Sequence, residues 1–167
     1  RAKAAGFKLN AEHPEVVYTC DIFDRDSLSY VTENSIAVNM GSIEMIHQYG
    51  PIAKRKNITL RINPGFGHGH SQKTNTGGPS SKHGIWHEEL QQALAAAKKY
   101  DLIVEGIHMH IGSGTDFKHL STVCDAMYKV VKAVGNEVTM ISAGGGLPIP
   151  YHKDEDRIEV QKYSELW

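Results

Sequence analysis

The stretch LIVEGIHMHIGSG, Leu102–Gly114, joins a β-rich segment to a loop that is mostly glycine. His108 and His110 stand two residues apart, so on a strand their side chains would share one face. The apolar residues beside them would share the other face; they are Ile107, Met109 and Ile111. We therefore expect a strand over residues 102–111 that packs one face against helices and presents two imidazoles on the other.

The same alternation of β-rich and helical segments runs through the whole chain. Strands are expected at 15–20, 35–39, 58–62, 102–111 and 137–142. Helices are expected at 24–34, 42–50, 88–99 and 116–134. Five β/α units predict an α/β fold with a parallel sheet, either open and doubly wound or part of a (β/α)8 TIM barrel. A complete barrel takes about 250 residues, so 167 residues would hold only part of one.

Composition excludes several classes of function. The formal net charge is −1 and no segment concentrates Lys and Arg, which argues against nucleic acid or an anionic membrane as a partner. The two cysteines, Cys20 and Cys124, lie far apart in the sequence, so we expect no disulfide framework and a cytoplasmic location. No apolar run approaches the roughly 18 residues that a membrane span needs.

The expected carboxyl ends of the strands are polar or glycine, whereas the strand bodies are mostly apolar. These ends carry Asp21 after Cys20, Asn39, Arg61 with Asn63, His108, His110 with Ser113, and Ser142 with Gly144–Gly146. Ligands of parallel β/α folds bind at that edge of the sheet. The sequence therefore predicts the functional site there.

Two glycine-rich loops follow neighbouring expected strands, Gly112–Gly114 and Gly144–Gly146. Bare backbone N–H groups can approach an anion closely, and the Ser113 hydroxyl adds a donor. The two loops predict one phosphate held between them, and a pair of flexible turns is the alternative. Arg61 would be either a charged donor to this site or an ordinary salt-bridge partner.

The residues alone leave the role of the two histidines open. His108 and His110 could bind a metal, pack a flat ring against a flat ligand, or form hydrogen bonds within a polar barrel interior. A metal-dependent barrel hydrolase would need further His or Asp at later strand ends, and the next strand instead runs into Ala143-Gly-Gly-Gly146. We therefore predict no metal at this pair.

A long polar segment, residues 63–86, separates the third expected strand from the next helix, and loops of this length are usually functional or disordered. Its Gly65–Gly69 stretch has the third glycine one place too early for the dinucleotide pattern GxGxxG. The segment and its border carry four histidines, His68, His70, His83 and His87. Because no Cys or carboxylate stands among them, we expect a loop that contacts substrate rather than a metal site.

Four motifs stand out along the chain. They are LRINPGFGHGHSQKTNTGG at 60–78, SSKHGIW at 80–86, GIHMHIGSG at 106–114 and ISAGGGL at 141–147. In this order they resemble bacterial diaminopimelate decarboxylases, which are pyridoxal-phosphate enzymes with an alanine-racemase-like barrel. The resemblance runs from Arg1 to Trp167, and His83 departs from it because many members have Phe at that position.

The resemblance implies pyridoxal 5′-phosphate as the cofactor and assigns the residues that bind it. His110 would stack on the cofactor ring, and Arg61 would lie near it. The phosphate would be bound by Ser113 together with the glycine triplet Gly144, Gly145 and Gly146.

The resemblance also implies that residues 1–167 are the central part of the barrel domain, strands three to seven of eight. The Schiff-base lysine would lie upstream of Arg1, so no catalytic residue is assigned within the chain. A Glu-Pro-Gly-Arg motif and a C-terminal β-domain would lie beyond Trp167. The full-length protein would be a homodimer, with Lys82 in an ion pair between subunits, and the isolated segment is expected to be inactive.

The implied activity is decarboxylation of an amino acid, meso-diaminopimelate, to L-lysine and CO2, the last step of lysine biosynthesis. A decarboxylase of ornithine or arginine is the nearest alternative, because the substrate-contacting C-terminal residues would lie outside the chain. A non-enzymatic pyridoxal-phosphate carrier on the same barrel would not need the long loop 63–86. A metal-dependent barrel hydrolase is the least favoured alternative.

Overall fold

The computed structural model describes residues 1–67, 75–113, 116–147, 149–153 and 157–167. Within these ranges, six parallel strands form one sheet in the order β1-β2-β3-β5-β6, with β4 paired to β3. The strands are β1 Val17–Cys20, β2 Ala37–Met40, β3 Asn57–Asn63, β4 Ile85–Trp86, β5 Ile103–His108 and β6 Met140–Ser142. Their carboxyl ends therefore meet at one edge.

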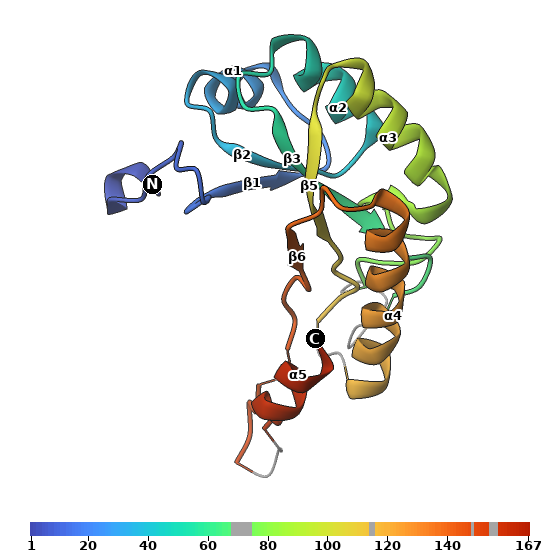
Figure 1. Cartoon of the computed structure of the whole chain (residues 1–167). Coiled ribbons are helices and arrows are strands. Elements are labelled where there is room, and N and C mark those ends of the chain that lie inside the picture. Colours follow the sequence, from blue (N-terminus) through green and yellow to red (C-terminus); the bar gives the residue numbers. More distant parts are fainter. Residues whose placement is uncertain (68–74, 114–115, 148, 154–156) are drawn as a thin grey trace.

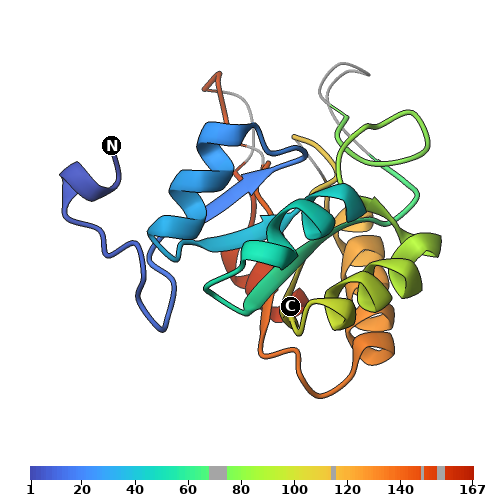
Figure 2. The same cartoon turned by 90° about the horizontal axis from the view of Figure 1, so that it is seen from above.

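Helices connect the strands and cover one side of the sheet. They are α1 Arg25–Glu33, α2 Ile43–Tyr49, α3 Leu90–Lys99, α4 Phe117–Val134 and α5 Val160–Leu166, with short 3-10 helices at Lys3–Ala5, Gly50–Ile52 and His87–Glu89. Figures 1 and 2 show α1 to α4 in an arc around a strongly curled sheet. A doubly wound sheet carries helices on both faces, so the prediction of a partial (β/α) barrel is confirmed.

Three helices begin where the sequence has a capping residue shortly after a strand. The side chains of Asp24, Ser42 and Asp116 accept a hydrogen bond from the backbone N–H three residues later, at the starts of α1, α2 and α4. Such caps satisfy N–H groups that the first helical turn leaves unpaired. None of the helices in the described ranges is long and apolar enough to cross a bilayer.

Three strands differ from the sequence-based expectation. The strand expected at 102–111 ends at His108, and the one expected at 137–142 keeps only three residues in β6. Strand β4 has only two residues, too few for a sequence period to predict it. It forms because Ile85 and Trp86 lie beside Ile62 and Asn63 of β3.

A β-bulge interrupts β5 at Glu105. The pairing with β3 passes from Val104 to Gly106 while β3 advances by one residue, so Glu105 is an extra residue in the strand. The Glu105 carboxylate accepts hydrogen bonds from Asn57 at 2.5 Å and from Arg55 at 3.5 Å. These contacts hold the extra residue near the amino end of the sheet.

The bulge decides which way the two histidines face. Val104 and Ile107 both pack in the core with the helices, although residues three apart lie on opposite faces of a regular strand. Because the bulge absorbs this shift, Met109 follows Ile107 into the core, and His108 and His110 lie on the concave side. The prediction that the two imidazoles share a face opposite the apolar residues is confirmed.

The two faces of the sheet differ in chemistry. The convex face packs against the helices through buried apolar side chains, among them Met40, Met45, Ile46, Tyr49, Ile58, Leu60, Ile62, Ile107 and Met109. The concave face instead carries Thr19, Asn39 and His108, which are joined by hydrogen bonds of the Asn39 amide. The apolar core therefore lies outside the curl of the sheet, and the polar side chains lie inside it.

Gly106 has no room for a side chain, since a Cβ there would lie 2.6 Å from Thr59 Oγ1 and 3.1 Å from Met140 Cε. We expect Gly106→Ala to lower the free energy of unfolding of the full-length protein by about 1–3 kcal/mol, as overpacking does. Chemical denaturation measures this. Adding Thr59→Ala removes the nearest atoms and should recover part of the loss. Equal stability of Gly106→Ala and the unaltered protein would contradict this packing.

Candidate functional site at the carboxyl edge of the sheet

Asp21, directly after β1, ties together three parts of the carboxyl edge. Its carboxylate lies 3.5 Å from Nη1 of Arg61 on β3. It also accepts hydrogen bonds from Nδ1 of the His83 ring and from the backbone N–H of Gly84. Because His83 and Gly84 directly precede β4, these bonds hold the end of the long loop onto the sheet.

Arg61 is a cation enclosed by the curled sheet, with 8% of its surface exposed. Burial lowers the pKa of its guanidinium and the neighbouring Asp21 raises it, but arginine stays charged because its pKa starts so far above neutrality. Among the described residues, Asp21 is its only hydrogen-bond partner. The guanidinium therefore keeps donors for an anionic group.

His108 lies deeper on the concave side and binds across it to β2. Its Nδ1 lies 2.7 Å from Nδ2 of Asn39. Burial, followed by the positive charge of Arg61 and by His110, lowers the pKa of His108 to about 4. The ring is therefore neutral at physiological pH.

His110 packs against the second glycine loop. The backbone N–H of Gly145 donates to His110 Nδ1 at 3.2 Å, so the neutral ring carries its proton on Nε2. Burial and then Arg61 lower the pKa of His110. A Cβ on Gly144 would lie 2.7 Å from the His110 Cβ, and the φ of +72° at Gly144 also favours glycine. The site thus holds a flat, uncharged ring beside bare backbone.

The two glycine loops touch each other. A Cβ on Gly146 would collide with the carbonyl oxygen of Gly112 and lie 3.0 Å from the Cα of Ser113. A Cβ on Gly145, in contrast, would meet no atom within 4 Å. Ser113 is exposed beside this opening, and Gly114 lies outside the described residues. The loops therefore leave an open space at Gly145, with a serine next to it.

Thr76 and Gly78 attach the long loop to this site. The Asn63 amide accepts from the Gly78 N–H at 2.9 Å and donates to the Gly78 carbonyl at 3.0 Å. The Thr76 N–H donates to the Ile111 carbonyl, and its hydroxyl donates to the His110 carbonyl, both at 3.3 Å. The loop thereby fixes the backbone that carries His110.

The structure describes two of the four histidines of the loop region, His83 and His87. His68 and His70 lie outside the described residues, as does the rest of 68–74. His83 is bound to Asp21, and His87 begins a 3-10 helix ahead of α3. In the part of the chain that the structure describes, no three His, Cys, Asp or Glu side chains are arranged to hold a metal ion.

The structure brings together all the residues singled out for a cofactor, namely Arg61, His110, Ser113, Gly144, Gly145 and Gly146. It adds four residues that hold them or their neighbours: Asp21, Asn39, Thr76 and His83. For Asp21 and Asn39 the sequence contains a signal, their position at strand ends. For Thr76 and His83 it contains none, because their contacts depend on how the loop folds back.

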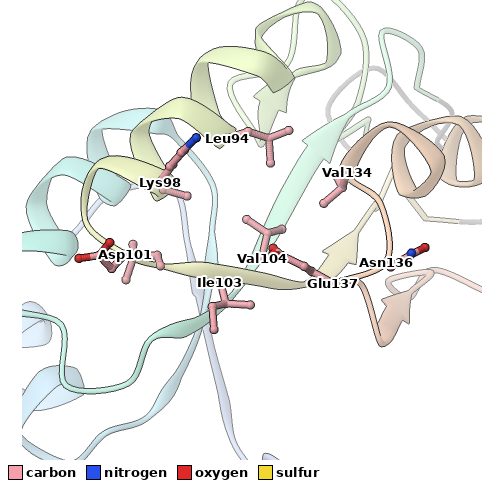
Figure 3. A pocket seen from close by; sticks show the side chains of 10 residues that line it. Leu94, Lys98, Asp101, Ile103, Val104, Val134, Asn136 and Glu137 are labelled. Atoms are coloured by element: carbon pink, nitrogen blue, oxygen red, sulfur yellow. The ribbon is translucent and has the colours of Figure 1, made fainter.

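A cleft lies at the edge of the sheet opposite the candidate site (Figure 3). It measures about 760 Å³ and is lined by Leu94 and Lys98 of α3, Ile103 and Val104 at the start of β5, and Val134 at the end of α4. Its lining contains none of the predicted site residues. Since ligands of parallel β/α folds bind at carboxyl strand ends, size alone does not make this cleft the functional site.

Comparisons with known proteins agree with this fold. The family described as "Pyridoxal-dependent decarboxylase, pyridoxal binding domain" matches residues 2–167. Diaminopimelate decarboxylases of Streptomyces coelicolor and Buchnera aphidicola subsp. Schizaphis graminum are 48% and 50% identical over 100% of this chain, which covers 38% and 39% of their lengths. A crystal structure of diaminopimelate decarboxylase superposes with a TM-score of 0.92 at 47% identity, over 99% of this chain and 39% of that one.

The chain thus spans about two fifths of the length of the curated relatives that it matches. The family match covers nearly every residue, and the superposed crystal structure shares the fold over 99% of this chain. The chain belongs to the pyridoxal-dependent decarboxylase family, within its pyridoxal-binding domain.

Proposed function

We propose that the protein containing this chain decarboxylates meso-diaminopimelate to L-lysine and CO2 with pyridoxal 5′-phosphate as cofactor. The observation that carries the proposal is 48–50% identity to diaminopimelate decarboxylases along the whole chain, together with the assembly of the predicted cofactor residues at one edge of the sheet. The chain holds no assigned catalytic residue, and the activity belongs to the full-length protein.

The residues at this edge fit the proposed cofactor in shape and charge. Gly145 borders open space in which an added Cβ would meet nothing within 4 Å, whereas the neighbouring Gly144 and Gly146 exclude side chains. This cradle of bare backbone, with the exposed hydroxyl of Ser113, suits a phosphate. The neutral, flat His110 suits an aromatic ring, and the buried cation of Arg61 suits a nearby negative charge.

Pyridoxal phosphate, when bound, supplies the electron sink for the carbanion that loss of CO2 leaves behind. The chain's own residues would bind and orient that group. His110 would hold the ring by stacking, and Ser113 would donate to the phosphate. Arg61 would counter negative charge in an interior where electrostatic interactions are strong, and Asp21 would fix its direction.

Further parts of the proposal rest on the family resemblance. Residues 1–167 would be strands three to seven of the barrel, with the Schiff-base lysine upstream and Glu-Pro-Gly-Arg and a β-domain downstream. The full-length protein would be a cytoplasmic homodimer, and Lys82 would form an ion pair between its subunits.

The substrate is tested by expressing the full-length gene and measuring CO2 release and product with meso-diaminopimelate, ornithine and arginine. We expect turnover with meso-diaminopimelate, L-lysine as the product, and at most traces of activity with the other two. Preference for ornithine or arginine would replace the proposed substrate while keeping the cofactor. No release of CO2 from any of the three would overturn the proposed function.

The phosphate cradle is tested by titrating pyridoxal phosphate into the full-length apo-protein. Ser113→Ala removes a donor to a charged acceptor and should weaken binding by about 1.5–3 kcal/mol. Gly145→Val should weaken it further, because its side chain would occupy the open space. Ser121→Ala, on the exposed surface of α4, is the matched control and should bind normally. Unchanged dissociation constants for both site variants would mean that the phosphate binds elsewhere.

The neutral imidazoles predict that acid destabilises the apo-protein. Since the pKa of His108 is about 4 when folded and about 6.5 when unfolded, the unfolded state binds more protons between these values. Stability is then lost as the pH falls through that window. From about pH 7 to about pH 5, His108 should account for a loss of about 2 kcal/mol. Urea denaturation of the unaltered protein and of His108→Gln should differ by this amount in pH dependence; identical profiles would contradict it.

A further inference from the structure

The hydrogen bond between Asn39 and His108 joins β2 to β5 across the concave side, over the intervening β3. Asn39 is 3% exposed and stands beside Thr19 in the register of the sheet. Its Nδ2 lies 2.7 Å from His108 Nδ1 and 3.4 Å from Thr19 Oγ1. The amide is therefore held in place from two sides.

This bond fixes the protonation of the His108 ring. An amide nitrogen can only donate, so His108 Nδ1 accepts and the proton of the neutral ring lies on Nε2. That Nε2–H makes no hydrogen bond within the described part of the chain. His108 consequently offers a neutral donor with a fixed position.

Asn39 also has a hydrogen-bonding atom to spare. Its Oδ1 is buried and has no partner among the described residues. Buried polar atoms in folded proteins are almost always hydrogen-bonded. An open donor on His108 and an open acceptor on Asn39 therefore indicate that a polar group from outside the described residues completes this pair.

The pair belongs to the same interior as the proposed cofactor residues. His108 is opposite Arg61 in the register of β3 and β5 and shares the concave face with His110. Ser113 follows His110 in the sequence, and the second glycine loop packs against the His110 ring. If the phosphate of the cofactor lay at those loops and its ring on His110, the ring would be the part nearer to His108 and the phosphate the part farther from it.

We propose that His108 is a further cofactor-contacting residue, whose Nε2–H donates to the phenolic oxygen of the pyridoxal ring, and that Asn39 is the positioning residue that fixes this tautomer. The inference rests on the proposed function for the identity of the cofactor. It assigns a role to the first histidine of the His-x-His pair, which the stacking of His110 leaves unexplained.

The contact is tested by binding of pyridoxine 5′-phosphate to the full-length apo-protein, because this probe lacks the aldehyde and cannot bond to lysine. We expect His108→Phe to weaken binding roughly tenfold or more. With a 3-deoxy analogue of the probe, which lacks the phenolic oxygen, the penalty should disappear. An equal penalty with both probes would overturn the assignment to this oxygen. His47→Phe, on the exposed face of α2, is the matched control.

Asn39→Asp tests the tautomer separately. A carboxylate only accepts, so Nδ1 would carry the proton and the neutral ring would lose its Nε2 donor. We expect the dissociation constant of the variant, divided by that of the unaltered protein, to fall as the pH is lowered from about 8 to about 6 and the ring becomes doubly protonated. The titratable and charged groups around His108 are the same in both proteins: Arg61 and His110 face it, and Asp21 and His83 lie beyond Arg61. A ratio independent of pH would overturn the role of Asn39.

The outcomes separate this inference from the proposed function. Binding of the probe that is insensitive to His108→Phe overturns the inference and leaves the function standing. If His108→Phe weakens binding of the probe as expected but the protein does not act on meso-diaminopimelate, the proposed function alone is overturned. Thermal unfolding of each variant identifies any that fail to fold, and if His108→Phe is one of them, the pH-dependent ratio of Asn39→Asp decides.

Discussion

The bulge at Glu105 is the constraint on which the site depends. One extra residue lets Val104 and Ile107 both enter the apolar core. Each residue after Glu105 therefore points to the face opposite the one it would take in a regular strand, so that His108 and His110 face the interior of the curl. A regular strand with the same sequence would place both imidazoles on the apolar face that packs against the helices, where burial of an unpaired polar group costs free energy. Asn57 and Arg55, the partly buried partners of Glu105, hold the bulge at the amino end of the sheet.

The charge distribution inside the curl follows from that geometry. Arg61 is the enclosed cation, Asp21 its carboxylate, and the two nearby imidazoles are kept neutral by burial and by the guanidinium itself. Two protonated histidines beside Arg61 would repel one another in an interior of low dielectric constant. As neutral rings they add flat surface and directed N–H donors without adding charge. This combination suits a ligand that is both aromatic and anionic.

The three glycines of the loop Gly144–Gly146 have two different physical roles. Gly144 and Gly146 are required by the protein, because their φ values are positive and a Cβ would strike His110 or the Gly112 loop. Gly145 is not crowded by the protein at all, and its N–H is committed to His110. Its lack of a side chain leaves open the space that the proposed cofactor phosphate would occupy. Within this three-residue motif, the two ends are required for packing, and only the centre borders open space.

Much of the architecture follows from the sequence. The alternation of β-rich and helical segments, the caps at Asp24, Ser42 and Asp116, and the polar strand ends are local properties that short-range physics determines. They predict a parallel β/α fold and the edge that carries the site. The motif order around Arg61, His110, Ser113 and the glycine triplet also predicts the family.

Only the tertiary structure decided how those residues meet. Whether the imidazole face of β5 points inward depends on a bulge whose partners are on β3, and β4 exists because the long loop returns to that strand. The contacts of Asp21 with His83 and of Asn39 with His108 join residues 62 and 69 positions apart. No local pattern encodes such pairs, because they form when the curvature of the sheet brings separate strand ends together.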